Sequence, residues 1–346
     1  MKIKVLKFGG TSVGSIEAIK RSADIIRDWS KKSKVIAVLS AMSGETDRLI
    51  NLTKSFSKNP NPIDFDNAIS SGENVSCALM SICLNNQKIK AKSLLSWQIP
   101  IITSSEHMKS RILSINKKFL YDELENFEVL LIPGFQGINN KGELTTLGRG
   151  GSDTSAVAVA AAMETECIIY TDVEGVFTTD PNIVPKAKKI NKISYEEMLE
   201  LASQGAKVLQ TRSVELAMRK NTKLSVRSSF KPKKIGTMIT DEKSVLENNT
   251  VSGITYSKDE AKITLSRVQD KPGVSSKIFG PLAKGNINVD MILQNISQDG
   301  KFANLSFTLP RLDLEKALKI LKKEKSIIGY KKIISSNNIS KISVVG

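Results

Sequence analysis

A glycine-rich turn that contains an arginine offers the clearest chemistry in the sequence. It lies in the stretch 145–156 and is followed by an alanine-rich segment at 157–162. Glycines let the backbone turn tightly and approach a ligand, and Ser152 or Asp153 can cap a helix whose free N–H groups face the turn. The guanidinium of Arg149 can bind a carboxylate or a phosphate through two parallel hydrogen bonds. The stretch predicts an anion site, although an ordinary turn before a capped helix has the same composition.

A second glycine turn, with a lysine in front of it, follows the first predicted strand. Lys7 lies near the end of a segment at 1–8 in which lysines alternate with apolar residues, Gly9 and Gly10 come directly after it, and an apolar stripe at 16–26 predicts a helix. Backbone N–H groups in such a turn can face an anion, and the lysine can reach over the turn to a phosphate. The turn is not a Walker A loop, because the lysine precedes the glycines. A solvated lysine at a strand end is the simpler alternative.

The order of strand, turn and helix recurs along the first two thirds of the chain. Short apolar strands are predicted at 35–39, 128–132 and 168–171, and Ser40 and Thr46 follow the first of these. Repetition of this order is typical of a parallel α/β sheet, whose ligand site lies at the carboxyl ends of the strands. We therefore expect an α/β fold, with a mainly parallel sheet between layers of helices.

Other segments complete the expected first domain. A predicted helix contains Gly72 directly before Glu73, and because glycine costs a helix about 1 kcal/mol relative to alanine, the pair suggests a close approach by a ligand. We also expect a helix at 111–125 and the last strand of the sheet at 224–227.

The pattern changes after a charged, turn-rich segment at 231–236. The remainder predicts the order strand, helix, strand, strand, helix, strand at 261–267, 274–284, 287–294, 302–309, 312–323 and 330–334. This βαββαβ order belongs to ferredoxin-like modules, which bind small ligands or pair with themselves. A further strand is predicted at 342–345. We expect one domain over residues 1–245 and a second over 246–346.

Composition excludes several classes of function. The formal charge of +16 permits contact with polyanions, but the lysines are scattered and aromatic residues make up only 5%, so we expect no nucleic-acid partner. Three cysteines without a C-x-x-C pair support neither a disulfide framework nor a zinc site. His107 is the only histidine, which removes Ser-His-Asp, Cys-His and multi-histidine metal chemistry. Without a signal peptide or a long apolar segment, we expect a cytoplasmic protein that does not cross a membrane.

Six motifs in the same order closely resemble the aspartokinase family, which belongs to the amino acid kinase superfamily and phosphorylates aspartate with ATP. They lie at 7–12, 40–42, 71–73, 134–137, 145–156 and 171–176. Residues 270–274 and 286–295 resemble the first ACT domain of the family, a regulatory module that senses lysine or threonine. The resemblance covers nearly the whole chain. It implies formation of 4-phospho-L-aspartate, the first step of lysine, threonine and methionine synthesis.

The resemblance also implies roles for individual residues. Lys7 and Asp153 are implied to be catalytic, with Asp153 orienting the lysine or the metal. The implied aspartate contacts are Ser40, Thr46, Glu73, Arg149, Gly150, Gly151 and Ser152. The implied nucleotide contacts are Lys7, Gly9, Gly10, Thr171, Asp172, Asp180 and Lys207. Mg²⁺ is expected to arrive with ATP rather than on a dedicated protein site. The β-carboxylate of aspartate, with a pKa near 3.9, is already ionised at pH 7, so the reaction requires no general base.

The sequence departs from the family pattern at three places. Asn182 stands where arginine usually follows Asp-Pro, and Gln210 with Thr211 replaces the commoner His-Pro. Residues 341–346 match only the first strand of a second ACT domain, whereas such family members carry two. A lysine or threonine effector and a homodimer or larger homo-oligomer are implied partners. The alternatives are an acyl kinase similar to glutamate 5-kinase, and a non-catalytic amino-acid sensor on a kinase-like scaffold.

Overall fold

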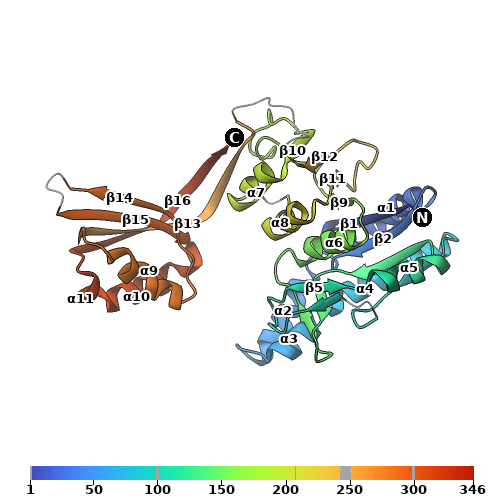
Figure 1. Cartoon of the computed structure of the whole chain (residues 1–346), viewed down its shortest axis with the longest axis horizontal. Coiled ribbons are helices and arrows are strands. Elements are labelled where there is room, and N and C mark those ends of the chain that lie inside the picture. The colour runs from blue at the N-terminus through green and yellow to red at the C-terminus, as the bar shows by residue number, and fades with distance from the viewer. Residues whose placement is uncertain (1, 99–100, 207, 242–250, 298–300) are drawn as a thin grey trace. The chain divides into compact units, whose positions relative to one another are not determined.

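The structure is a computed structural model that describes residues 2–98, 101–206, 208–241, 251–297 and 301–346 (Figure 1). Its chain divides into two compact units. The first contains residues 1–254 together with 344–346, and the second contains residues 255–343. Each unit has a sheet and a hydrophobic core of its own.

An eight-stranded sheet forms the centre of the first unit. Its strands lie in the order β10, β12, β11, β9, β1, β2, β6, β3. Their bounds are β1 Ile3–Phe8, β2 Lys34–Leu39, β3 Ala91–Ser93, β6 Val129–Pro133, β9 Cys167–Thr171, β10 Lys192–Ser194, β11 Leu224–Ser228 and β12 Thr237–Thr240. Every neighbouring pair is parallel except β11 with β12. The prediction of a mainly parallel α/β sheet is confirmed. The expected last strand at 224–227 is not the end of the sheet, because β12 and β10 extend it.

Two hydrophobic clusters lie on opposite faces of this sheet. Val5 packs in one cluster and Leu6 in the other, as the alternation of side chains along a strand requires. Both faces are therefore covered, which explains the nearly continuous apolar sequence of β2. The helices of the unit are α1 Ile16–Ser30, α2 Glu45–Phe56, α3 Pro62–Ile69, α4 Ser71–Asn86, α5 Lys117–Asn126, α6 Gly151–Ala162, α7 Tyr195–Ser203 and α8 Thr211–Lys220.

A smaller sheet of four short strands lies in the same unit, in the order β5, β4, β7, β8. These strands are β4 Ile101–Thr103, β5 Ile112–Ile115, β7 Gln136–Ile138 and β8 Leu144–Thr146. The helix expected at 111–125 was wrong in its first part, since β5 pairs with β4 and α5 begins only at Lys117. Strand β8 leads directly into the Arg149 turn, so this small sheet supports one side of the predicted site.

The second unit has the predicted βαββαβ order. Its elements are β13 Gly253–Gln269, α9 Val274–Lys284, β14 Asp290–Ile296, β15 Phe302–Pro310, the 3₁₀ helix η3 Arg311–Asp313, α10 Leu314–Lys323, α11 Lys325–Ile328 and β16 Lys332–Val345. The sheet order is β14, β15, β13, β16. Apolar side chains of α9 and α10, such as Ile278 and Leu321, form the core with Phe307 of β15. The separate strand expected at 342–345 was wrong, because these residues are the last part of β16.

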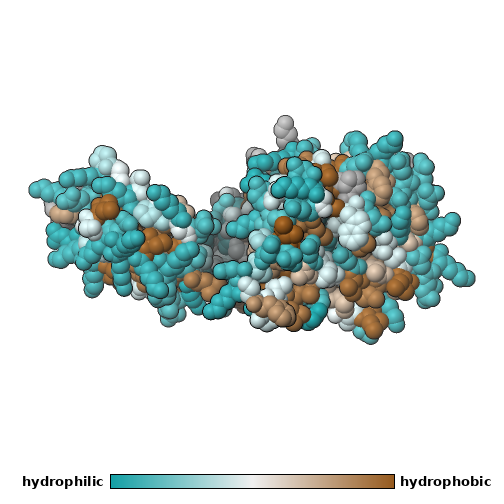
Figure 2. All heavy atoms as spheres, turned by 90° about the horizontal axis from the view of Figure 1, so that it is seen from below, coloured by the Kyte–Doolittle hydropathy of each residue, from teal (hydrophilic) through white to brown (hydrophobic). Residues whose placement is uncertain are grey.

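The visible surface of the molecule is largely hydrophilic, with apolar residues scattered among the polar ones (Figure 2). This is the surface expected of a chain with a quarter of its residues charged. No helix in the described part of the chain is long and apolar enough to cross a membrane.

Candidate active site

The carboxyl ends of the central strands bring several predicted residues to one edge of the sheet. Phe8 of β1 pairs with Leu39 of β2 on one side and with Tyr170 of β9 on the other. Lys7, Ser40 and Thr171 therefore reach the same edge, as expected for a parallel sheet. The predicted motifs at 7–12, 40–42 and 171–176 converge here.

Gly134 brings the start of α6 to the same edge. It follows β6, and its N–H donates to the carbonyl of Leu39 at 2.9 Å. A Cβ at Gly134 would lie 2.8 Å from the Cβ of Ser152, which is closer than two such carbons can approach. Glycine at this position therefore lets Ser152 and the first turn of α6 pack directly against the end of β6.

Lys7 and Asp153 form an ion pair at this edge, although 145 residues separate them in the chain. The Lys7 Nζ atom lies 2.6 Å from Asp153 Oδ1, and the two side chains are only 12% and 9% exposed. Asp153 is in the first turn of α6, where the positive end of the helix dipole favours an acid. No described residue other than Lys7 offers a donor to Asp153 Oδ1, so Lys7 is the group that balances its charge.

The expected capping role of Ser152 or Asp153 was wrong. The N-cap of α6 is Gly150, which makes no side-chain capping bond. Its φ of 71° lies in the left-handed region that favours glycine. Asp153 is three residues further along the chain and pairs with Lys7, so its carboxylate serves the site rather than the helix end.

The first glycine turn differs in part from the prediction. The Gly9 N–H donates to the carbonyl of Tyr170 at 3.3 Å, so the expectation that this amide stands free for a phosphate was wrong. The absence of a Gly9 side chain still matters, because a Cβ there would lie 3.5 Å from the Lys7 Nζ atom. A Cβ at Gly10 would lie 3.1 Å from the carbonyl oxygen of Ala41. Gly9 thus leaves room beside the Lys7 ammonium, and Gly10 lets its turn lie close to the Ala41 backbone.

Glu73 is a buried carboxylate without a positive partner among the described residues. It lies in the first turn of α4, is 3% exposed, and accepts a hydrogen bond from the backbone N–H of Ala41. Its Oε2 atom receives no hydrogen bond from any described residue. Burial raises the pKa of Glu73 from 4.5 to about 7, against the smaller lowering effect of backbone hydrogen bonds. An ammonium group beside Oε2 would neutralise this carboxylate.

Gly72 explains why α4 can approach the loop after β2. A Cβ on Gly72 would lie 2.8 Å from the Cβ of Ala41. The glycine predicted to permit a close approach therefore does so, but the neighbour is the chain itself. This contact places the Glu73 carboxylate under the Ala41 amide, beside the turn that holds Gly10.

Arg149 lies in a tight turn between two glycines in the left-handed region, Gly148 at φ 78° and Gly150 at φ 71°. Its side chain is exposed, and no described residue forms a hydrogen bond or an ion pair with it. A Cβ on Gly150 would lie 2.0 Å from Cγ of Gln210, so the turn packs tightly on one of the residues that depart from the family pattern. The guanidinium is thus available to an anion, on a turn that the structure constrains.

The positions of the other predicted site residues say less about their roles. The Ser40 N–H donates to the carbonyl of Phe8, and Thr46 is the second residue of α2. Thr171 donates to Asp172 at 3.1 Å through its hydroxyl. Asp180 lies in the loop between β9 and β10, where its carboxylate accepts the N–H of Asn182 at 2.9 Å. Lys207 lies outside the described residues. Among the described residues, no group of three or more His, Cys, Asp or Glu side chains is arranged to hold a metal ion.

A buried network around Asp66 was not predicted from the sequence. Asp66, in α3, is completely buried and meets His107 and Thr146, which lie 41 and 80 residues away in sequence. In the sequence, nothing about a lone histidine and an acid 41 residues before it indicates that the two side chains meet. The pairing becomes visible only when β8 and the loop before β5 fold against α3.

Two family models match the chain. The model described as the amino acid kinase family covers residues 2–228, and the ACT domain model covers residues 263–326. An aspartate kinase of Pseudomonas putida is 46% identical over 349 residues, which span 100% of this chain and 84% of that protein. An aspartokinase of Helicobacter pylori is 47% identical over 351 residues, which span 99% of this chain and 85% of that protein.

Solved structures give the same result for the fold. The E. coli aspartokinase III structure in complex with aspartate and ADP superposes with a TM-score of 0.80 at 24% identity, covering 99% of this chain and 87% of that one. An aspartate kinase from Synechocystis gives a TM-score of 0.63 at 37% identity, covering 99% and 60%. The fold and the site define an amino acid kinase that carries an ACT domain. Within that class, the full-length identities show that the chain belongs to the aspartokinase family.

Proposed function

We propose that the chain transfers the γ-phosphoryl group of ATP to the β-carboxylate of L-aspartate, giving 4-phospho-L-aspartate and ADP. The observation that carries this assignment is the buried Glu73, whose Oε2 atom has no donor among the described residues. An amino acid supplies the ammonium group that this carboxylate lacks. The family membership supports the same reaction, since the most similar relatives named above are aspartate kinases.

The chemistry of the transfer fits the residues at the sheet edge. One oxygen of the ionised β-carboxylate attacks the γ-phosphorus in line, and the bond from that phosphorus to the bridging oxygen of ADP breaks. No proton has to be removed, which accords with a site built from lysine, arginine and carboxylates. The Lys7 ammonium would neutralise charge on the phosphate oxygens, and Asp153 would hold that ammonium in place.

We assign the nucleotide contacts from where these residues lie in the fold. Gly9, at which a Cβ would lie 3.5 Å from the Lys7 Nζ atom, and the ends of β1 and β9 form the edge next to Lys7. Thr171, Asp172, Asp180 and Lys207 remain proposed nucleotide contacts. Mg²⁺ carried with ATP would offset the negative charge of the phosphates.

We assign the contacts with aspartate from the charges of Glu73 and Arg149. Glu73 would bind the α-ammonium group, and Arg149 would bind a carboxylate of aspartate. Ser40, Thr46, Gly150, Gly151 and Ser152 are the proposed remaining contacts with aspartate. Arg149 is assigned to the carboxylate rather than to the phosphates because Lys7 is the buried cation at the glycine turn.

Replacement of Arg149 by alanine tests this assignment. We expect Arg149→Ala to lower kcat/KM for aspartate about 30-fold, which corresponds to the loss of about 2 kcal/mol from a charged hydrogen bond. The KM for ATP should change less than about twofold. Aspartate-dependent ADP release measures both constants. Arg219→Ala is a matched control, because that arginine is 73% exposed and pairs with Glu215 on its own helix. An unchanged aspartate KM in Arg149→Ala would contradict the proposal that Arg149 binds a carboxylate of aspartate.

For the ACT unit we propose a regulatory role and association with a second copy of the chain. Strand β14 lies at an edge of its sheet, and its residues, including Met291, Ile292 and Leu293, are exposed. An exposed apolar edge strand is a surface that another strand can cover. Lysine and threonine are the proposed effectors, and adding each to the ADP-release assay would distinguish them.

A further inference from the structure

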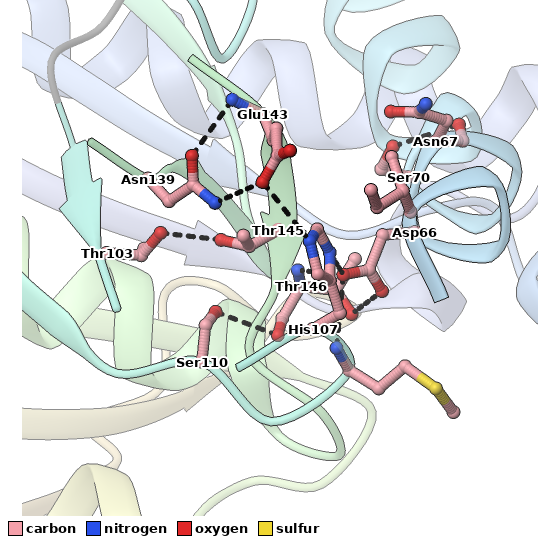
Figure 3. Close-up of polar contacts among 12 residues, drawn as sticks. Asp66, Asn67, Ser70, Thr103, His107, Ser110, Asn139, Glu143, Thr145 and Thr146 are labelled. Atoms are coloured by element: carbon pink, nitrogen blue, oxygen red, sulfur yellow. Dashed lines mark hydrogen bonds and ion pairs between the residues drawn. The ribbon is translucent and has the colours of Figure 1, made fainter. Parts of the chain in front are cut away.

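Asp66 accepts hydrogen bonds from two separate segments of the first unit, residues 107–108 and Thr146 (Figure 3). Its Oδ1 atom accepts the Thr146 hydroxyl at 2.6 Å, and its Oδ2 atom accepts the backbone N–H of Thr146 at 3.1 Å. The same Oδ2 atom accepts the N–H of Met108 at 3.0 Å and lies 2.9 Å from His107 Nδ1. Four donors around one completely buried carboxylate satisfy its charge without an arginine or lysine.

Thr146 is consequently held at every polar atom. Besides the two bonds to Asp66, its carbonyl oxygen accepts the N–H of Ser110 at 3.0 Å and the hydroxyl of Ser110 at 2.9 Å. The next residue is fixed as well, because Leu147 donates to Phe135 and its carbonyl accepts from Arg212 at 2.9 Å. Arg149 follows two residues later. The position of its turn is therefore set by how β8 is anchored.

Asp66 also belongs to the segment that carries Glu73. Helix α3 ends at Ile69 and α4 begins at Ser71, so a single residue separates the two helices. The amide group of Gln136 donates to the carbonyl of that residue, Ser70, at 3.0 Å, which ties the junction to β7. The two charges assigned to aspartate thus reach the site through elements that meet at Asp66.

His107 completes the arrangement from the loop before β5. Its Nδ1 atom faces Asp66, and its Nε2 atom lies 3.6 Å from Glu143 Oε2. Glu143 in turn accepts from the side chain of Asn139 at 2.7 Å (Figure 3). The acid–histidine–acid row joins α3 to the hairpin of β7 and β8, so the only histidine supports the frame of the site and stands outside its chemistry.

We propose that Asp66, through its bonds to Thr146, is a positioning residue that fixes the Arg149 turn relative to the helix of Glu73. The inference rests on the proposed function, since it assumes that Arg149 and Glu73 bind the same substrate. A displacement of about 1 Å in such a group is enough to change catalysis by orders of magnitude. Loss of the Asp66–Thr146 bond should therefore weaken aspartate use while leaving ATP use intact.

Valine substitutions at two adjacent threonines test the proposal. Thr146→Val removes the hydroxyl that donates a hydrogen bond to Asp66 and keeps the shape of the side chain. Thr145→Val is the matched control, because the Thr145 hydroxyl bonds Thr103 on β4 at 2.5 Å and not α3. We expect Thr146→Val to raise the aspartate KM about tenfold with the ATP KM within twofold, and Thr145→Val to change neither. Thr146→Ser, which keeps the hydroxyl, should recover the wild-type KM to within about twofold.

A double variant separates this inference from the proposed function. If Asp66 acts through Arg149, Thr146→Val should add less than about twofold to the aspartate KM of Arg149→Ala. Equal KM values for Thr146→Val and Thr145→Val, or fully additive effects with Arg149→Ala, would overturn the positioning role. An unchanged aspartate KM in Arg149→Ala alone would instead overturn the proposal that Arg149 binds a carboxylate of aspartate, on which the inference rests. Should Thr146→Val not fold, Asp66→Asn is the second variant, with the same pattern expected.

Discussion

Raising the pH from 6 to 8 is expected to increase kcat/KM for aspartate about tenfold in the wild-type chain, because the ionised fraction of Glu73 rises through its pKa of about 7. Only the ionised carboxylate can pair with the α-ammonium group of the substrate. At pH 8, Glu73→Gln should lower kcat/KM for aspartate about 100-fold, since a buried charged hydrogen bond is lost. Its residual activity should show little of the pH dependence.

The same substitution should stabilise the free protein at high pH. Burial raises the pKa of Glu73 from 4.5 to about 7, so the contribution of this group to the stability of the wild-type chain is largest below about pH 4.5. That stability is lost as the pH rises to about 7, because the folded state resists ionisation of this carboxyl group. The shift in the pKa of Glu73 corresponds to about 3 kcal/mol in the free energy of unfolding. Glutamine, whose buried amide is uncharged, should retain about 2 kcal/mol of this stability at high pH.

Two measurements check this prediction. Thermal unfolding of Glu73→Gln and the wild type at pH 5 and pH 8 should give a difference in stability that is large at pH 8 and small at pH 5. Steady-state kinetics between pH 6 and pH 8 should give the tenfold rise only in the wild type. Glu164→Gln is the control, because that side chain is 79% exposed and pairs with Lys117. A wild-type kcat/KM that stays flat across this range would contradict the role of Glu73.

Lys7→Met is expected to reduce kcat about 100- to 1,000-fold while changing the aspartate KM little. The methionine keeps the length of the side chain but removes the cation that would offset charge on the transferred phosphoryl group. The variant should also lose about 3 kcal/mol of stability, because Asp153 is 9% exposed and would keep its charge without a partner.

A second substitution separates these two effects. Lys7→Met combined with Asp153→Asn should recover most of the lost stability, since no uncompensated charge remains at the sheet edge. The double variant should stay as inactive as Lys7→Met. Chemical denaturation and ATP-dependent turnover measure the two properties independently. Return of activity together with stability would show that the pair serves the fold alone.

The predictable part of the site came from glycine turns at the boundaries of elements. Lys7 lies at the end of a strand with parallel neighbours on both sides, and such strand ends meet at one edge of a sheet. The Arg149 turn was predictable from its glycines and the helix that follows it, because it links β8 of the small sheet to α6. The βαββαβ order of the second unit was predictable for a similar reason, because the apolar periodicity of each element is local.

The unpredicted features depend on contacts between distant segments. Strand β5 was expected to begin a helix, but pairing with β4 outweighs the local pattern at 112–115. Strand β12 was not predicted, and it owes its place to pairing with β11 and β10. The Gly9 amide was predicted to face a phosphate. Its hydrogen bond to the Tyr170 carbonyl could not be predicted without knowing which strand lies next to β1.

The network of Asp66 shows the same limit for side chains. Its carboxylate and the Thr146 hydroxyl are 80 residues apart, and the two meet only because α3 packs against β8. Glu73 was predicted as a site residue from its neighbour Gly72 and from the family resemblance. Its missing donor, on which the pH prediction depends, is visible only in the fold.

Chemical trapping of the product tests the central claim most directly. The purified chain is incubated with MgATP, hydroxylamine and either aspartate or glutamate, and the hydroxamate is identified by mass spectrometry. We predict ATP-dependent formation of the β-hydroxamate of aspartate and none from glutamate. Hydroxamate from glutamate alone would favour an enzyme similar to glutamate 5-kinase. Hydroxamate from neither substrate would contradict catalysis and favour the amino-acid sensor.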